Sequence, residues 1–121
     1  MRERIKDVGR LEHILKSIDY IIDFTKGLIF EDFNRDIKLQ FAIVKNIEII
    51  GEASYKLSHE FREQHPEVPW RKIIDSRHIL VHDYYQIRLE IIWDIVLKEM
   101  YPLKEQIQQL YDNELLISII S

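Results

Sequence analysis

Apolar residues recur along most of the chain at steps of three and four, which is the spacing of one face of an α-helix. The first stretch predicts a helix over residues 2–26. Gly27 follows it and tolerates the left-handed conformation that often ends a helix. A loop over residues 28–33 then leads to a second predicted helix over residues 34–64.

Two prolines mark the end of this second stretch. Pro66 removes a backbone donor and restricts the residue before it, so it ends the helix, whereas Pro69 suits the first turn of a new one. The pattern predicts a third, shorter helix from Pro69 through Asp83. A fourth helix follows Tyr85 and runs to Asn113, because its apolar residues keep a regular spacing of three and four: Leu89, Trp93, Val96, Met100, Leu103, Ile107 and Leu110.

The second predicted helix is apolar on two sides. One stripe consists of Ile43, Ile47, Ile50, Ser54, Leu57 and Phe61, and a second begins with Phe41, Val44 and Gly51. Such a helix either sits centrally or also faces a second protomer. Glycine costs up to about 1 kcal/mol relative to alanine inside a helix, so Gly51 indicates that another backbone packs close to it.

Composition supports an all-α fold. A chain of 121 residues has room for one domain, and three glycines with three prolines are too few for the many turns of β or α/β folds. The absence of cysteine excludes disulfides, cysteine-based zinc sites and a thiol nucleophile. We expect an up-and-down bundle of four main helices over residues 1–113, followed by an apolar tail of unassigned role over residues 114–121.

Several features bear on location and partners. No apolar stretch is long enough to span a membrane, and the charged N-terminal residues do not resemble a signal peptide, so we expect a cytoplasmic protein. Seventeen basic and 21 acidic residues give a net charge of −4. Proteins that bind nucleic acid through phosphate neutralisation alone usually carry a basic stripe, which this sequence lacks. Any nucleic-acid contact would therefore be local, in a groove with a few arginines.

The stretch over residues 75–85 concentrates chemically active side chains. On a helix His78 and His82 are four apart and share a face, while Arg77 and Tyr84 are seven apart and share another. Arg77 and His82 are five apart, about 140° around the axis. They converge only through the long arginine side chain, through distortion of the helix, or across a two-fold axis.

Arg77, His82 and Tyr84 together resemble the R-x4-H-x-Y motif of the HepT-like toxins, which belong to the HEPN superfamily of helical ribonucleases. The resemblance extends over nearly the whole chain. His78 stands where the family often has asparagine, so the role of this position is less defined. The flanking segments that resemble the family are Gln40-Phe41-Ala42, Ile50-Gly51-Glu52-Ala53, Pro69-Trp70, Ile73-Ile74 and Trp93-Asp94-Ile95.

This resemblance implies a homodimer whose two motifs face each other and a metal-independent endoribonuclease toxin that needs no cofactor. The RNA substrate, such as tRNA or mRNA, would be cleaved when its own 2′-hydroxyl attacks the adjacent phosphate. His82 would move a proton, Arg77 would stabilise the phosphate, and His78 would assist. A cognate nucleotidyltransferase antitoxin would neutralise the toxin by adenylylating Tyr84. Glu52 is a further candidate, either orienting the motif residues or serving as an ordinary polar position.

Other interpretations of the same residues stay open. His82 could simply cap or buttress its helix, Arg77 could pair with Asp75 or Asp83, and Tyr84 could be a packing residue. The two histidines with one of these aspartates could hold a metal, although no third ligand stands at a telling spacing. The main alternative function is a non-catalytic HEPN module that binds a nucleotide or a partner nucleotidyltransferase, which the negative net charge favours.

Overall fold

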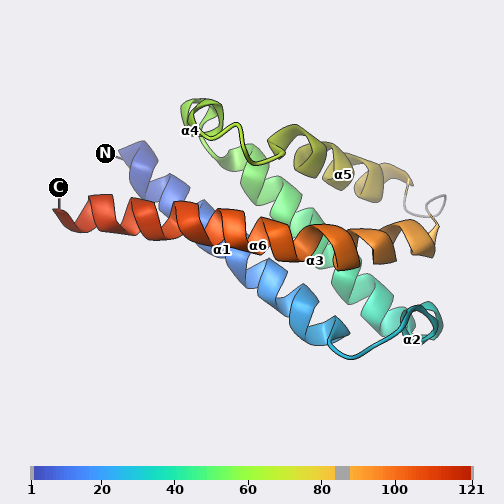
Figure 1. Ribbon diagram of the computed structural model, residues 1–121. Coiled ribbons are helices and arrows are strands. Elements are labelled where there is room, and N and C mark those ends of the chain that lie inside the picture. Colours follow the sequence, from blue (N-terminus) through green and yellow to red (C-terminus); the bar gives the residue numbers. More distant parts are fainter. Residues whose placement is uncertain (1, 84–87, 121) are drawn as a thin grey trace.

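The computed structural model describes residues 2–83 and 88–120, apart from the side chains at positions 2, 3, 79 and 81–83. Within these residues the regular secondary structure is entirely helical, which confirms the all-α prediction. The long helices α1, α3, α5 and α6 alternate in direction as an up-and-down bundle (Figure 1). The elements are α1 (Arg2–Thr25), α2 (Phe30–Arg35), α3 (Ile37–Lys56), α4 (His59–Gln64), α5 (Trp70–Asp83) and α6 (Leu89–Ile120).

Helix α3 is the central element, since it packs against α1 on one side and α5 on another. The first predicted stripe, which runs from α3 into α4, is buried throughout, and so is the seam of α6 apart from the partly buried Leu89. Helix α1 completes this core with buried residues that include Leu11, Leu15 and Ile18, whereas Ile5 is exposed. The burial of these stripes is the main stabilising contribution, because apolar area removed from water contributes about 25 cal/mol per Å².

A short helix occupies most of the segment that was predicted to be a loop. Helix α2 begins after Ile29, whose backbone N–H donates to the Asp32 carboxylate at 2.9 Å. Phe33 is fully buried, and its ring stacks on Trp93 with a centroid distance of 5.2 Å. The loop prediction was wrong because this helix is too short to show a helical periodicity in its apolar residues. Phe33 is its one buried residue.

The prediction of a single helix over residues 34–64 is also wrong, because the helical conformation is interrupted at Leu57 and Ser58. Leu57 leaves the helical conformation, with φ −60° and ψ 146°, and Ser58 then caps α4 by accepting the Phe61 N–H at 3.2 Å. The buried carboxylate of Asp7 accepts the Ser58 N–H at 2.9 Å and the Ser58 hydroxyl at 2.8 Å. Helix α1 thus holds the break in place.

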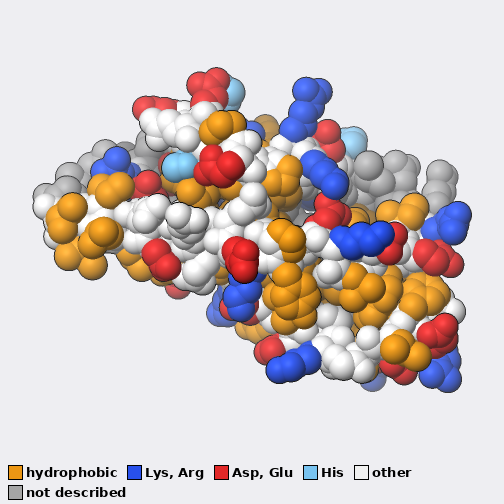
Figure 2. All heavy atoms as spheres, in the orientation of Figure 1, with side chains coloured by type: hydrophobic (Ala, Val, Ile, Leu, Met, Phe, Trp, Pro, Cys, Tyr) orange, Lys and Arg blue, Asp and Glu red, His pale blue; other side chains and the backbone are white. Residues whose placement is uncertain are grey.

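Helix α6 continues beyond Asn113, where its end was predicted, and includes the apolar tail up to Ile120. An ion pair between Arg4 and Glu114, 3.3 Å apart, ties this extension to the start of α1. Leu116, Ile119 and Ile120 are exposed there, and hydrophobic side chains gather at this end of α6 in Figure 2. Among the described residues, no helix combines the length and the hydropathy needed to cross a membrane.

Candidate functional site

The candidate site is built on the contact between α3 and α5. Gly51 is buried in α3, and a β-carbon at this position would overlap the β-carbon of Arg77 and lie 3.1 Å from the carbonyl oxygen of Ile73. The prediction that another backbone packs close to Gly51 is therefore confirmed. The second apolar stripe of α3 faces α5 at Gly51, while Phe41 at its start is exposed.

Helix α5 places the motif residues on different sides. Arg77 faces α3 and is partly buried, whereas His78 is exposed. Positions 77 and 82 belong to one continuous α-helix, so they stay about 140° apart around its axis. Within one chain, helical geometry thus directs the two motif positions away from each other.

The charge of Arg77 acts on the Glu52 carboxylate, but the direct ion-pair partner of Glu52 is Lys56. Its carboxylate forms an ion pair with the Lys56 ammonium at 3.0 Å. The hydrogen bond from Lys56 and the charge of this residue lower the pKa of Glu52, and the charges of Arg77 and Lys45 lower it further. Glu52 therefore carries a negative charge close to the guanidinium that is expected to meet a phosphate.

The structure describes only part of the predicted motif. Arg77 and His78 are described with their side chains, and His82 lies in the last turn of α5 without a described side chain. Tyr84 lies outside the described residues. The roles assigned to these side chains therefore remain predictions.

The structure tests the metal alternative only in part. Among the side chains that the structure describes, no three of the histidine, aspartate or glutamate type come together to hold a metal ion. The proposed set of His78 and His82 with Asp75 or Asp83 falls partly on side chains outside this description.

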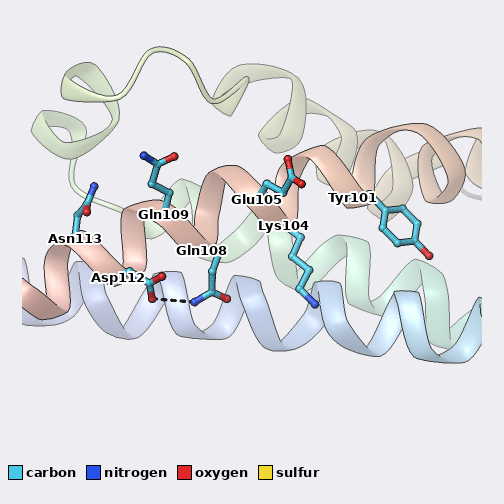
Figure 3. A pocket seen from close by; sticks show the side chains of 7 residues that line it. All are labelled: Tyr101, Lys104, Glu105, Gln108, Gln109, Asp112 and Asn113. Atoms are coloured by element: carbon cyan, nitrogen blue, oxygen red, sulfur yellow. Dashed lines mark hydrogen bonds between the residues drawn. The ribbon is translucent and has the colours of Figure 1, made fainter.

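One hollow, of about 600 Å³, lies along the outer face of α6 and contains none of the predicted site residues (Figure 3). All seven lining residues come from this one helix. Its Lys104 reaches Asp19 of α1 at 2.8 Å, and its Gln108 donates to Asp112 at 3.0 Å. Lys104, Gln108 and Asp112 are thus engaged in local contacts, and none of the lining residues belongs to α5.

A second hollow, of about 360 Å³, lies where the end of α3, α4 and the start of α5 meet. We call it the α4–α5 hollow. It is lined by Tyr55, His59, Arg62, Glu63, Trp70, Arg71, Ile74 and Asp75. The sequence does not predict this hollow, because its lining residues come from three elements and form no sequence pattern. The one available signal was Tyr55, which lies one helical turn after Gly51.

The sequence of the chain is similar to those of known proteins. The family model described as "Ribonuclease HepT-like" matches residues 14–110, which include all of α3 and α5. The chain is 43% identical to "Putative RNase TTE0752" of Caldanaerobacter subterraneus subsp. tengcongensis, over 86% of this chain and 93% of that protein. It is 39% identical to "Probable ribonuclease HepT" of Thermococcus cleftensis, over 83% of this chain and 91% of that protein.

A third relative is "Putative RNase MJ0127" of Methanocaldococcus jannaschii, which is 42% identical over 78% of this chain and 79% of that protein. No solved structure matches the chain significantly. The family match covers most of the helical bundle, and the sequence motif lies inside the matched range. The chain therefore belongs to the HepT-like ribonuclease family.

Proposed function

We propose that the protein is a metal-independent endoribonuclease that acts as the toxin of a toxin–antitoxin pair. The observation that carries this proposal is the position of Arg77, held against the backbone of α3 at Gly51 inside a chain of the HepT-like family. A guanidinium suits a phosphate because its planar fork donates several hydrogen bonds and keeps its charge. RNA is accordingly the proposed substrate, with tRNA and mRNA as the candidate classes.

In the proposed reaction the 2′-hydroxyl of the RNA attacks the adjacent phosphorus, and the bond to the 5′-oxygen of the next nucleotide breaks. His82 moves a proton, a role that suits histidine as a residue type in general acid–base catalysis. Arg77 stabilises the charge on the pentacoordinate phosphate, and His78 assists. The products are a 2′,3′-cyclic phosphate and a free 5′-hydroxyl.

A homodimer is part of this proposal. Positions 77 and 82 diverge by about 140° around α5. A two-fold axis that brings two copies of α5 face to face would therefore let Arg77 of one protomer and His82 of the other meet at one phosphate. Closed two-fold dimers are the commonest soluble oligomers, so this arrangement needs no unusual symmetry.

The proposed control is covalent. A cognate nucleotidyltransferase would catalyse attack of the Tyr84 hydroxyl on the α-phosphate of ATP, forming a phosphodiester and releasing pyrophosphate. The attached adenylyl group would place negative charge near Arg77, seven residues away, and bulk in the RNA groove. The modified toxin would then be silent without a change of fold.

The alternative is a non-catalytic module that binds a nucleotide or the nucleotidyltransferase, which the net charge of −4 favours. Purified protein incubated with total RNA and with tRNA in EDTA separates the two. The nuclease proposal expects fragments that end in 2′,3′-cyclic phosphates, and no cleavage of RNA whose 2′-hydroxyls are methylated. Intact RNA in every reaction, together with retained nucleotide or partner binding, would favour the module.

A further inference from the structure

The α4–α5 hollow is the strongest unassigned feature of the molecule, because it brings aromatic and basic side chains together beside the motif helix. Its floor includes the ring of Trp70, which is buried and donates through its indole N–H to the carbonyl oxygen of His65 at 2.9 Å. Its rim carries groups that are still available to a ligand.

Tyr55 supplies an open aromatic ring at this rim. Its side chain is 62% exposed, and within the described part of the chain it makes no hydrogen bond, ion pair or ring contact. Trp70 and Ile74 add apolar surface to the same hollow. An exposed aromatic face beside apolar surface is the usual platform on which a nucleobase stacks.

Two arginines supply positive charge. Arg71 has a side chain that is 94% exposed, and its contact with the exposed Asp75 is long, at 3.9 Å. Such exposed pairs contribute little free energy, so the guanidinium remains available. Arg62 also lines the hollow and forms no ion pair with a described residue. The acidic Glu63 is already paired with His59 at 2.7 Å.

The hollow and motif position 82 lie along the same side of α5. Tyr55 lies one turn from Gly51, and Gly51 abuts Arg77. On α5 the exposed residues Arg71, Asp75 and His78 follow a spacing of four and three, and position 82 falls at the next step of four. A strand that passes position 82 and His78 therefore reaches the hollow along the same side of α5.

We propose that the α4–α5 hollow binds a flanking nucleotide of single-stranded RNA, with its base stacked on Tyr55 and its phosphate held by Arg62 and Arg71. The inference rests on the proposed ribonuclease function and extends it to the substrate class. A single strand is required because the base faces of a duplex are covered by their neighbours. The proposed subsite also accounts for RNA binding by a chain with a net negative charge, since the positive charge is needed only locally.

Binding of a fluorescent single-stranded oligonucleotide with 2′-O-methyl groups tests the proposal by anisotropy, because this probe cannot undergo attack by its own 2′-oxygen. Loss of base stacking costs about 1–3 kcal/mol. Tyr55→Ala should therefore weaken binding about 5- to 140-fold, at about 1.4 kcal/mol per tenfold change. Tyr55→Phe keeps the ring and should bind like the wild type. Tyr101→Ala removes another exposed tyrosine, from α6, and should have no effect.

Arg71→Gln should lower the slope of log affinity against log salt by about 0.7, the value for one phosphate contact on a single strand. Arg35→Gln, on α2, is its matched control. Equal affinities of Tyr55→Ala and Tyr55→Phe, an unchanged slope for Arg71→Gln, or no binding by the wild type would overturn the subsite. If Tyr55→Ala and Arg71→Gln instead lose only the binding of a co-expressed protein partner, the hollow is a protein contact and the RNA subsite is wrong.

This outcome is separable from failure of the ribonuclease itself. Cleavage of unmodified RNA by the wild-type protein, with loss of cleavage in Arg77→Ala, reports on the function alone. A protein that cleaves RNA but binds the probe equally well with and without the Tyr55 ring retains the function and lacks the subsite.

Discussion

Gly51 of α3 and Arg77 of α5 meet with no room for a side chain between them. The β-carbon of Arg77 occupies the space that a β-carbon on residue 51 would need. The arginine expected to meet the scissile phosphate is thus positioned by the close approach of two helix backbones. Its placement depends on one glycine in a different helix.

The first prediction concerns this contact. Gly51→Ala should lower the free energy of unfolding by up to about 2 kcal/mol, because overpacking costs about 1–3 kcal/mol. The better helix propensity of alanine returns up to about 1 kcal/mol. The variant should also cleave RNA more slowly, because the substitution displaces α5 and with it Arg77. Thermal unfolding followed by circular dichroism, together with a cleavage assay, measures both effects.

Gly9→Ala is the matched control, since nothing lies within 4 Å of a β-carbon at that position in α1. It should stabilise the protein by up to about 1 kcal/mol and leave cleavage unchanged. Equal or higher stability of Gly51→Ala relative to Gly9→Ala would show that the close approach does not constrain α5.

The second prediction concerns the break between α3 and α4. Asp7→Ala removes both hydrogen bonds to Ser58, and bonds to a charged acceptor contribute about 1.5–3 kcal/mol. We expect a loss of about 2–3 kcal/mol in denaturant unfolding, and a smaller loss for Asp7→Asn, which keeps one acceptor oxygen. Glu12→Ala on the exposed face of α1 should stay within about 0.5 kcal/mol of wild type. A loss for Asp7→Ala as small as this control would contradict the account.

The third prediction concerns pH. Because Lys56 and, more weakly, Arg77 lower the pKa of Glu52 in the folded state, the ionised carboxylate stabilises the fold at pH values above its unfolded pKa, about 4.3. This contribution is lost as pH falls through the lower folded pKa. Stability of Glu52→Gln should therefore approach that of wild type in acid. Unfolding measured from pH 2 to 7 tests this, and Lys56→Met should remove most of the difference. A gap between Glu52→Gln and wild type that widens in acid would refute it.

The fourth prediction concerns Tyr84. Co-expression with a nucleotidyltransferase encoded beside this protein should add an adenylyl group to the peptide that contains Tyr84, as read by mass spectrometry. Tyr84→Phe should stay toxic in the presence of that enzyme, because it lacks the acceptor hydroxyl. Tyr85→Phe is the matched variant and should still be modified and silenced. Modification on Tyr85, or silencing without any modification, would rule out the tyrosine mechanism.

Much of the fold follows from the sequence because helical periodicity is local. The stripe from Ile43 to Phe61 and the seam from Leu89 to Leu110 identify buried faces without any knowledge of their partners. The close approach at Gly51 was also predictable, since glycine inside a helix is costly unless the space is needed. The sequence patterns that reveal these features each lie within a few helical turns, although the contacts themselves join different helices.

The remaining features depend on distant residues. The break at Ser58 is held by Asp7, which is 51 residues away, so no local pattern marks it. The α4–α5 hollow joins Tyr55, Arg62 and Arg71 from three elements. How Arg77 and His82 act together is equally non-local, because the two positions lie about 140° apart on one α-helix and the proposed homodimer would bring them to one phosphate.

The central claim is that Arg77 and His82 cleave RNA, and the most direct test is the cleavage rate of three purified variants on one tRNA substrate in EDTA. Arg77→Ala and His82→Ala should each lose cleavage by at least about a hundredfold, the scale of a lost general acid–base or electrostatic contribution. His13→Ala, which removes an exposed histidine of α1, should cleave like wild type. Circular dichroism should show all three folded. Undiminished cleavage by both Arg77→Ala and His82→Ala would contradict the account.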